Sequence, residues 1–214
     1  MNFDYVIVGA GSAGCVLADR LSANGRSTVL VLEAGGSDYR FFVQMPLGYG
    51  KTFYDPAVNW MYKTEPDPGL NGQASHWPRG KVLGGSSSIN AMVYIRGARE
   101  DFEEWEEQGN KGWGWAEVLN AFRAMEDNSA GANEYRGVGG PLYINDNARA
   151  MHALYDPFIK ASVAAGIPFN PDFNGETQEG VGNYQITTKN GRRNSAARAF
   201  AASMLMSATA FTSM

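Results

Sequence analysis

Three glycines near the start of the chain have the spacing of a phosphate-binding turn. Gly9, Gly11 and Gly14 follow the apolar run Phe3–Val8 in the sequence GAGSAG. In this pattern the first glycine permits a tight turn, the second lets the backbone approach a pyrophosphate, and the third lets a helix pack close to a strand. Glu33 follows Gly14 at the distance expected of a carboxylate that accepts hydrogen bonds from a ribose. These residues predict a dinucleotide site.

The residues around the glycines predict the elements that would position them. Phe3–Val8 has the composition of a buried strand, Ala13–Asn24 that of a helix, and Thr28–Leu32 that of a second strand. The residues expected to form the apolar stripe of the helix are Val16, Leu17 and Leu21. Such a βαβ unit has parallel strands and a right-handed crossover. The motif alone does not separate FAD from NAD or from a glycine-rich turn in an ordinary α/β domain, but a carboxylate at Glu33 disfavours NADP.

Composition and charge exclude several classes of protein. The chain has 214 residues, 44% of them hydrophobic, and a net charge of −4 without a basic block, so nucleic acid and anionic membranes are not expected partners. Cys15, the single cysteine, excludes an internal disulfide framework and is expected to be a small packed residue. The start of the chain does not resemble a secretory signal. The longest uncharged stretch has 16 residues, fewer than the ~20 of a spanning helix. A soluble, cytoplasmic protein is expected.

A second glycine-rich segment spans residues 77–97, WPRGKVLGGSSSINAMVYIRG. Gly84 and Gly85 precede three serines, which makes a loop dense in N–H groups and hydroxyls, and Asn90–Tyr94 is then apolar. A polar cradle that leads into an apolar element suits a ligand charged at one end and aromatic at the other. The alternative, a flexible surface linker, is disfavoured by the apolar residues Ile89, Met92, Val93 and Ile95.

In these two segments the chain resembles the glucose–methanol–choline (GMC) family of FAD-dependent oxidoreductases, in particular its choline dehydrogenase and bacterial alcohol dehydrogenase branch. The runs LVLEAGG, DFNGETQEGVG from Asp172 and GRRNSAARAF from Gly191 extend the resemblance from Asn2 to Phe200. It implies an α/β fold with a Rossmann-like FAD-binding βαβ domain, incomplete, and part of an α+β substrate-side region. The expected organisation is one FAD-binding region over residues 1–200, with its βαβ unit at 3–34 and its glycine–serine FAD loop at 78–97, and an atypical, truncated or frame-shifted tail at 201–214.

The resemblance implies an FAD contact at each position that matches a family motif. The positions that match the pyrophosphate turn are Gly9, Gly11, Ser12, Ala13 and Gly14. Those that match the adenosine ribose contact are Glu33 and Ala34. Those that match the loop along the FAD are Val82, Gly84, Gly85 and Ser86, and those beside the ribityl chain and isoalloxazine are Asn90, Ala91, Met92 and Val93. Some members attach FAD through a histidine where this chain has Ile89, so non-covalent FAD is implied.

The family reaction moves a hydride from an alcohol carbon to the flavin while a histidine takes the hydroxyl proton. The only histidines, His76 and His152, do not match that base, so no catalytic residue and no metal are assigned. The implied partners are a small alcohol such as choline and an electron acceptor, which is a quinone, another acceptor or oxygen. Three functions stay open: an FAD-dependent alcohol dehydrogenase or oxidase, a catalytically incompetent FAD-binding fragment, and a flavin-binding module without turnover. The alcohol, the acceptor and the oligomeric state are not identified by the sequence.

The remaining segments predict ordinary scaffold. Phe41–Pro68 is expected to be an extended excursion over the cofactor, and Glu100–Glu107 a solvated acidic helix held by Phe102 and Trp105. The residues expected to form the core stripe of a helix over Trp115–Asp127 are Val118, Leu119, Phe122 and Met125, and those of a further helix are Leu154, Phe158, Ile159 and Val163. A strand over Asn183–Lys189 and a turn at Asn190–Gly191 are also expected.

Overall fold

The computed structural model describes residues 2–146, 151–201 and 210–213, and the chain forms two compact units. Unit 1 consists of residues 1–92 and 188–214, and unit 2 of residues 93–187. The FAD-binding region expected over residues 1–200 is therefore divided between two units, each with its own elements.

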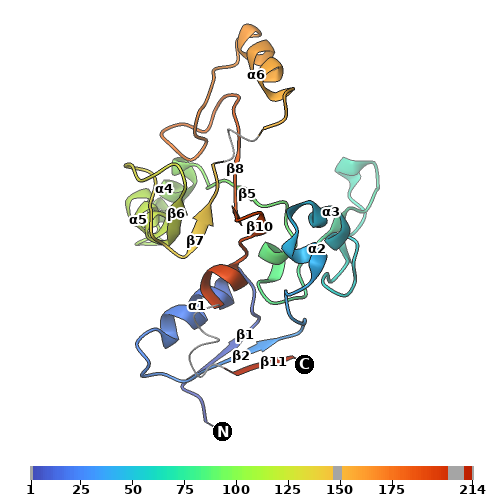
Figure 1. Ribbon diagram of the computed structural model, residues 1–214, viewed down its shortest axis with the longest axis vertical. Coiled ribbons are helices and arrows are strands. Elements are labelled where there is room, and N and C mark those ends of the chain that lie inside the picture. Colours follow the sequence, from blue (N-terminus) through green and yellow to red (C-terminus); the bar gives the residue numbers. More distant parts are fainter. Residues whose placement is uncertain (1, 147–150, 202–209, 214) are drawn as a thin grey trace. The chain divides into compact units, whose positions relative to one another are not determined.

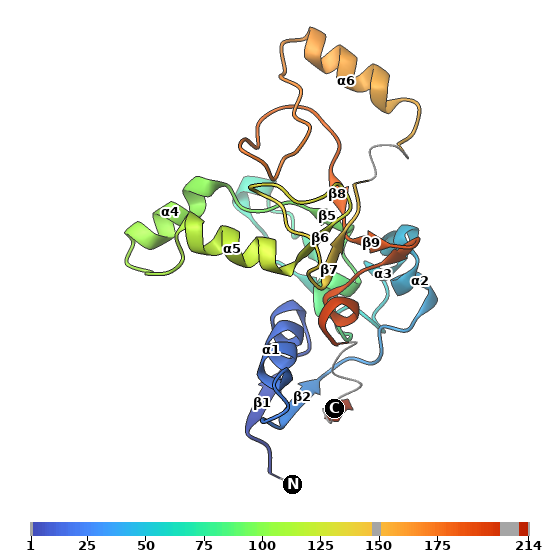
Figure 2. The same ribbon diagram turned by 60° about the vertical axis from the view of Figure 1, so that its left-hand side comes forward.

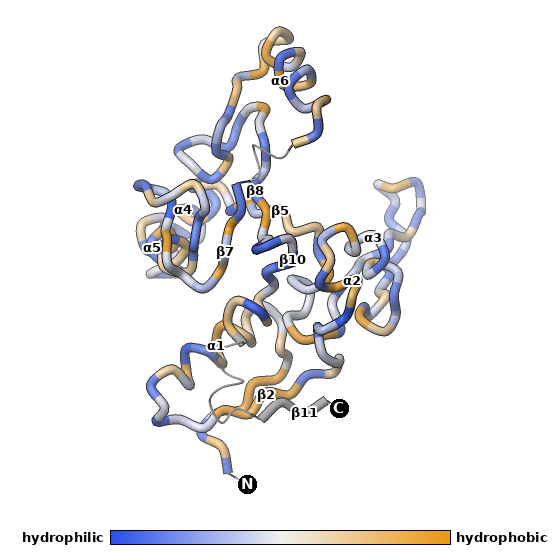
Figure 3. The backbone as a smooth tube through the Cα atoms, viewed as in Figure 1, coloured by the Kyte–Doolittle hydropathy of each residue, from blue (hydrophilic) through white to orange (hydrophobic). Residues whose placement is uncertain are grey.

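The predicted βαβ unit is present in unit 1. Strand β1 (Tyr5–Val8), helix α1 (Ser12–Ser22) and strand β2 (Val29–Glu33) follow one another, and the two strands pair in parallel. A third strand, β11 (Ala210–Ser213), pairs in parallel with the other edge of β2, which gives the order β1-β2-β11 (Figure 1). Both β1 and β2 consist mainly of apolar residues (Figure 3).

The prediction that Phe3–Val8 forms a buried strand is correct for the strand and wrong for its burial. Tyr5, Val6 and Val8 are exposed, Val8 by 78%, whereas alternate residues of β2 are buried. In the described part of the chain β1 has only β2 beside it, so it is an edge strand.

Helix α1 buries a different face from the predicted stripe of Val16, Leu17 and Leu21. Its buried residues are Gly14, Cys15 and Ala18, and Leu17 is half exposed. A Cβ at Gly14 would lie 1.9 Å from the carbonyl oxygen of Gly9. Since the helix approaches the turn this closely, only small residues fit at the contact, and larger apolar residues lie at its sides.

The tail, expected to be atypical, contains β11, while residues 202–209 lie outside the described residues. Strand pairing uses backbone N–H and C=O groups. An unusual composition therefore does not prevent this segment from joining the sheet.

The rest of unit 1 consists of short pieces, as predicted for Phe41–Pro68. They are α2 (Phe41–Gln44), the 3₁₀ turn η1 (Pro46–Gly48), α3 (Tyr49–Thr52), β3 (Tyr62–Lys63), η2 (Pro68–Leu70), β4 (His76–Trp77) and η3 (Gly85–Ser88). A hairpin of β9 (Thr188–Lys189) and β10 (Arg192–Arg193) and the π-helix η5 (Ala197–Ala201) follow. The turn predicted at Asn190–Gly191 is confirmed, because both residues have positive φ, 51° and 72°.

The described residues of unit 2 form short strand pairs and three helices (Figure 2). Strand β5 (Val93–Tyr94) pairs antiparallel with β8 (Gln185–Ile186), and β6 (Glu126–Asn128) pairs in parallel with β7 (Leu142–Ile144). The helices are α4 (Arg99–Glu107), α5 (Trp115–Met125) and α6 (Tyr155–Ala164). The single strand predicted over Asn183–Lys189 is two strands, β8 and β9, that belong to different sheets.

The helices of unit 2 are less buried than their apolar stripes predict. The stripe of α5 is half-buried, and α4 is a solvated acidic helix anchored by Phe102, with Trp105 half exposed. The core role expected of α6 is wrong: Phe158 is 65% exposed, and Leu154 and Val163 are exposed as well. In both ribbon views α6 lies apart from α4 and α5, so its apolar face has no helix of this unit to pack against (Figures 1 and 2). In the described part of the chain no helix is long and apolar enough to cross a bilayer.

Unit 2 contains a buried network of charges. The Glu126 carboxylate accepts hydrogen bonds from Arg96 Nη2 at 3.0 Å and from Arg136 Nη1 at 2.9 Å, and these three side chains are at most 2% exposed. Arg136 also pairs with Asp172, with Nε 2.8 Å from Oδ2. Glu126 Oε2 additionally accepts the N–H of Gly137 at 2.9 Å. The Glu126 carboxylate thus bridges two buried guanidinium groups, and Asp172 supplies the second negative charge.

Glu126→Gln is expected to destabilise the protein strongly, because the amide nitrogen would face an arginine donor and a buried charge would lose its partner. The free energy of unfolding should fall by about 3–5 kcal/mol. The measurement is urea denaturation followed by circular dichroism. Glu103→Gln is the control, because Glu103 forms an exposed pair with Arg99 on α4, and it should change stability little. Equal effects of the two substitutions would contradict the buried network.

Cys15 is expected to be unreactive in the folded protein. The thiol is 1% exposed, its Sγ donates a hydrogen bond to Ala10 O at 3.3 Å, and burial raises the pKa of Cys15 to about 11. At pH 8 only about one molecule in a thousand would carry the reactive thiolate. An Ellman titration should find no thiol in buffer and one per chain in urea. Complete reaction within minutes in buffer would show that α1 is not packed in this way.

Candidate cofactor-binding site

The first glycine turn is fixed by backbone contacts of unit 1. Gly9 has φ 95°, a left-handed conformation that favours glycine, and its N–H donates to Leu32 O at 2.7 Å. Gly11 is the N-terminal cap of α1, with φ −73°, and a Cβ there would meet no atom within 4 Å. The space in front of the α1 N-terminus is therefore open, and its free N–H groups favour an anion.

Glu33 joins this turn to the loop that follows β2. Its side chain is buried, with Oε2 accepting the N–H of Ala10 at 2.7 Å and Oε1 accepting the N–H of Gly35 at 2.9 Å. Each carboxylate oxygen has a second lone pair. Glu33 can therefore hold the two loops and still accept a hydrogen bond from a ligand hydroxyl.

The second glycine segment lies directly against the first. The N–H of Gly84 donates to Ala10 O at 2.8 Å, and a Cβ on Gly85, which has φ 54°, would lie 2.7 Å from the Cα of Gly11. Val82 forms a parallel bridge with Gly36 beyond the end of β2. The structure thus brings together the two segments that the sequence analysis assigned to one ligand.

A cavity of about 510 Å³ lies where the two segments meet. The predicted site residues in its lining are Gly9, Gly11, Ser12, Glu33, Ala34, Gly85 and Ser86. The others are not in its lining: Ala13, Gly14, Val82, Gly84, Asn90, Ala91, Met92 and Val93. Of these, Gly14 and Gly84 support the wall, because added side chains would collide with neighbouring atoms. The volume of the cavity is in the range of small-molecule pockets.

The cavity also contains residues that were not predicted as site residues. Trp60 and Tyr62 stack with ring centroids 5.9 Å apart and an interplanar angle of 3°. Lys81 Nζ lies 4.7 Å from the centre of the Trp60 ring, and Arg79 lines the same cavity. Two aromatic planes beside cations suit a heteroaromatic ligand with phosphates. The sequence predicted that Phe41–Pro68 lies over the cofactor, but it did not single out these two rings from the other aromatic residues of that segment.

The serines of the second segment mostly bond within their own loop. Ser87 Oγ donates to Gly84 O and Ser88 Oγ to Leu83 O, both at 2.6 Å. Ser86 Oγ, in the cavity lining, accepts the N–H of Gly80 at 3.1 Å and keeps its own proton for another acceptor. The polar cradle therefore consists of backbone groups and one hydroxyl.

Asn90 to Val93 passes from unit 1 into unit 2. Asn90 Oδ1 accepts the N–H of Met92 at 3.0 Å, and Met92 has φ 65° with a buried side chain. A left-handed methionine is uncommon. Ile89, before Asn90, is fully buried in the cluster with Val43, Val58 and Val82.

Neither histidine lies in the lining of the cavity. His76 Nε2 is 2.9 Å from Phe53 O, and its ring stacks on Tyr54. His152 Nδ1 accepts the N–H of Leu154 at 3.2 Å. Both histidines thus bond to backbone groups, and that neither is catalytic stays a prediction.

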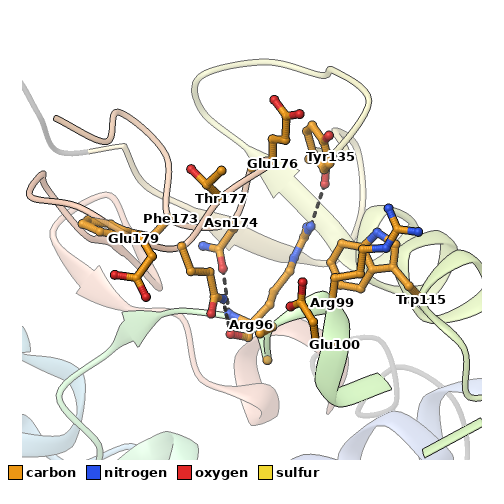
Figure 4. A pocket seen from close by; sticks show the side chains of 14 residues that line it. Arg96, Arg99, Glu100, Trp115, Tyr135, Phe173, Asn174, Glu176, Thr177 and Glu179 are labelled. Carbon is orange, nitrogen blue, oxygen red and sulfur yellow. Dashed lines mark hydrogen bonds between the residues drawn. The ribbon is translucent and has the colours of Figure 1, made fainter. Parts of the chain in front are cut away.

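Unit 2 has a cavity of its own, also of about 510 Å³ (Figure 4). It lies beside Arg96, whose N–H donates to Asn174 Oδ1 at 2.6 Å and whose Nη1 donates to Tyr135 O at 2.7 Å. The ring of Phe173 and three carboxylates, Glu100, Glu176 and Glu179, are also in the lining. The run DFNGETQEGVG, noted in the sequence, thus forms one wall of a cavity built on the Arg96–Glu126 pair.

The curated proteins that are similar to this chain in sequence are named as dehydrogenases of choline or alcohol. An oxygen-dependent choline dehydrogenase of Vibrio vulnificus (strain YJ016) is 50% identical over 200 residues, which are 93% of this chain and 36% of the relative. An alcohol dehydrogenase [acceptor] of Pseudomonas putida is 49% identical over 199 residues, 92% of this chain and 36% of the relative. The chain thus spans about a third of the length of these curated relatives.

Solved structures agree with the sequence relatives. Pyridoxine 4-oxidase from Mesorbium loti superposes with a TM-score of 0.92 at 36% identity, over 99% of this chain and 42% of that one. An FAD-dependent oxidoreductase from Chaetomium thermophilum superposes with a TM-score of 0.86 at 28% identity, over 97% and 37%. The family model for GMC oxidoreductases matches residues 3–212, twelve residues beyond the Phe200 limit of the predicted resemblance. One of these structural neighbours is thus named as FAD-dependent. The chain itself belongs to the GMC oxidoreductase family.

Proposed function

We propose that this protein is an FAD-dependent oxidoreductase acting on the CH–OH group of a small alcohol, and that unit 1 binds the FAD without a covalent bond. The observation that carries the proposal is the cavity at which both glycine segments, Glu33 and the Trp60–Tyr62 pair meet. The relatives are named for choline and alcohol, which favours an alcohol of that class. A quinone, another acceptor or oxygen would reoxidise the flavin.

The residues present fit FAD chemically. The backbone N–H groups at Gly11 and Ser12 would hold the pyrophosphate at the α1 N-terminus. Glu33 would accept a ribose hydroxyl, and Trp60 with Tyr62 would contact the adenine. Asn90 to Val93 would lie beside the ribityl chain and the isoalloxazine. Buried Ile89 has no nucleophile, which supports non-covalent binding.

Bound FAD supplies an acceptor for a hydride. The chain's own residues bind and orient it, and in the described part neither histidine is placed to take a proton from an alcohol. We therefore expect the catalytic base outside the described residues. The alternatives of an incompetent FAD-binding fragment and of a flavin-binding module without turnover predict the same binding site and differ only in turnover.

Gly11→Val is expected to abolish FAD binding without unfolding the chain. A Cβ at Gly11 meets no protein atom within 4 Å, so the branched side chain would project into the cavity where the pyrophosphate is proposed. The FAD dissociation constant, measured by fluorescence quenching, should rise at least about a hundredfold, the loss of two charge-assisted hydrogen bonds, while the melting temperature stays unchanged.

Gly36→Ala is the matched control, because Gly36 lies in the adjoining loop and its Cβ would also meet nothing within 4 Å, yet Gly36 is not in the cavity lining. It should bind FAD like the wild type. FAD binding that survives Gly11→Val would place the cofactor elsewhere.

The 214-residue chain is expected not to oxidise alcohols, even with FAD supplied, because hydride transfer needs a base near the hydroxyl. The measurement is the anaerobic bleaching of the flavin band with choline and simple primary alcohols, with dithionite as the positive control. Bleaching by an alcohol at a catalytic rate would show that a base is present, and His76→Gln and His152→Gln would then identify it.

A further inference from the structure

Arg193 is a buried cation that forms no ion pair with the described residues. It lies in β10 of unit 1 and is 1% exposed. Its Nε donates to Val43 O at 2.9 Å, and its Nη1 donates to Ser87 O at 3.2 Å and to Asn90 O at 2.7 Å. Nη1 also lies 2.8 Å from Asn90 Oδ1. All of these acceptors are neutral.

The guanidinium of Arg193 is also incompletely hydrogen-bonded. Its Nη2 is buried and has no partner in the described part of the chain. Burial lowers the pKa of Arg193 to about 10, which leaves it charged at pH 7. In unit 2, by contrast, Arg96 and Arg136 share the Glu126 carboxylate. A buried charge without a counter-charge costs free energy. A negative charge that is not among the described residues would stabilise Arg193.

Arg193 controls the conformation of the segment after the glycine–serine loop. Asn90 Oδ1, which accepts from Arg193, also accepts the N–H of Met92. That second bond closes the turn at Met92, whose φ of 65° is unfavourable for a side chain of this size. The arginine therefore holds, through Asn90, a strained turn in the segment that the proposed function places beside the isoalloxazine.

We infer that Arg193 is a positioning residue for the flavin: it fixes Asn90 and the Met92 turn, and its charge stabilises the negative charge that the isoalloxazine gains on reduction. A hydride adds two electrons and one proton to the ring, so the ring gains one negative charge. The pyrophosphate is not the counter-charge, because the cavity at the α1 N-terminus includes neither Arg193 nor Asn90 nor Ser87 in its lining. The inference rests on the proposed function.

The test compares two substitutions of Arg193 in the 214-residue chain. Arg193→Gln removes the charge but keeps an amide donor for Asn90, whereas Arg193→Lys keeps the charge. Arg192→Gln is the matched control, since Arg192 is the exposed neighbour in β10. The readouts are the dissociation constants of oxidised FAD and of ADP, which has the pyrophosphate but no flavin, and the midpoint potential of bound FAD from a dithionite titration with a reference dye.

Arg193→Gln should reduce the affinity for reduced FAD relative to oxidised FAD by about ten- to a hundredfold. At ~29.6 mV for each tenfold change of a two-electron couple, the midpoint potential should fall by about 30–60 mV. Arg193→Lys and Arg192→Gln should leave the potential close to that of the wild type, and the ADP affinity should be the same in all four proteins.

Three outcomes would overturn the inference and leave the proposed function intact. An unchanged potential in Arg193→Gln would show that the charge does not act on the flavin. A loss of ADP affinity equal to the loss of FAD affinity would place the charge at the pyrophosphate. Loss of oxidised FAD from both Arg193 variants would make the arginine purely structural. If the wild-type chain binds no FAD, the proposed function itself fails, and the inference fails with it.

Discussion

The cofactor site of this chain depends on one close approach of backbone to backbone. Gly85 lies so near Gly11 that an added Cβ would be 2.7 Å from the Cα of Gly11. This contact joins two segments that are far apart in the sequence, and it leaves backbone N–H groups rather than side chains in the cavity wall. Such a wall binds phosphate oxygens through peptide dipoles. Glu33 stabilises the same junction because it accepts N–H groups from both adjoining loops.

The two units of the chain treat buried charge in opposite ways. In unit 2 Glu126 bridges Arg96 and Arg136, and Asp172 supplies a second negative charge to Arg136. In unit 1 the buried Arg193 has only neutral acceptors and one nitrogen without a partner. Each of Arg96 and Arg193 has one buried nitrogen without a hydrogen-bond partner among the described residues, so the difference between the units lies in the charge pairing alone. Paired charges stabilise a fold, whereas an unpaired buried charge can act on a group that binds later. The difference between the units is therefore functional information that burial alone does not give.

The GMC relatives give this arrangement a chemical context. The glycine turn, residues 77–92 of the second glycine segment and the unpaired arginine lie in unit 1, together with the aromatic pair at Trp60 and Tyr62. A flavin needs the three kinds of contact that these residues offer: peptide dipoles for phosphate, flat rings for adenine and a positive field for the reduced ring. The chain's own histidines bond to neighbouring backbone groups instead. Unit 1 thus contains the residues to which the proposed function assigns the cofactor.

The sequence by itself determined the local parts of this site. The GAGSAG turn, α1, β2 and the Asn190–Gly191 hairpin follow from glycine spacing and hydropathy period, which are local properties, and the family followed from two motifs. Only the tertiary structure showed that Trp60, Tyr62 and Arg79 line the cavity, that Glu126 is buried between two arginines, and that Arg193 lacks a counter-charge. The tertiary structure also decided which faces are buried. It leaves faces of β1 and α6 exposed, and it buries the face of α1 that carries the small residues. A periodic pattern shows which residues share a face, but what that face meets depends on contacts between distant segments.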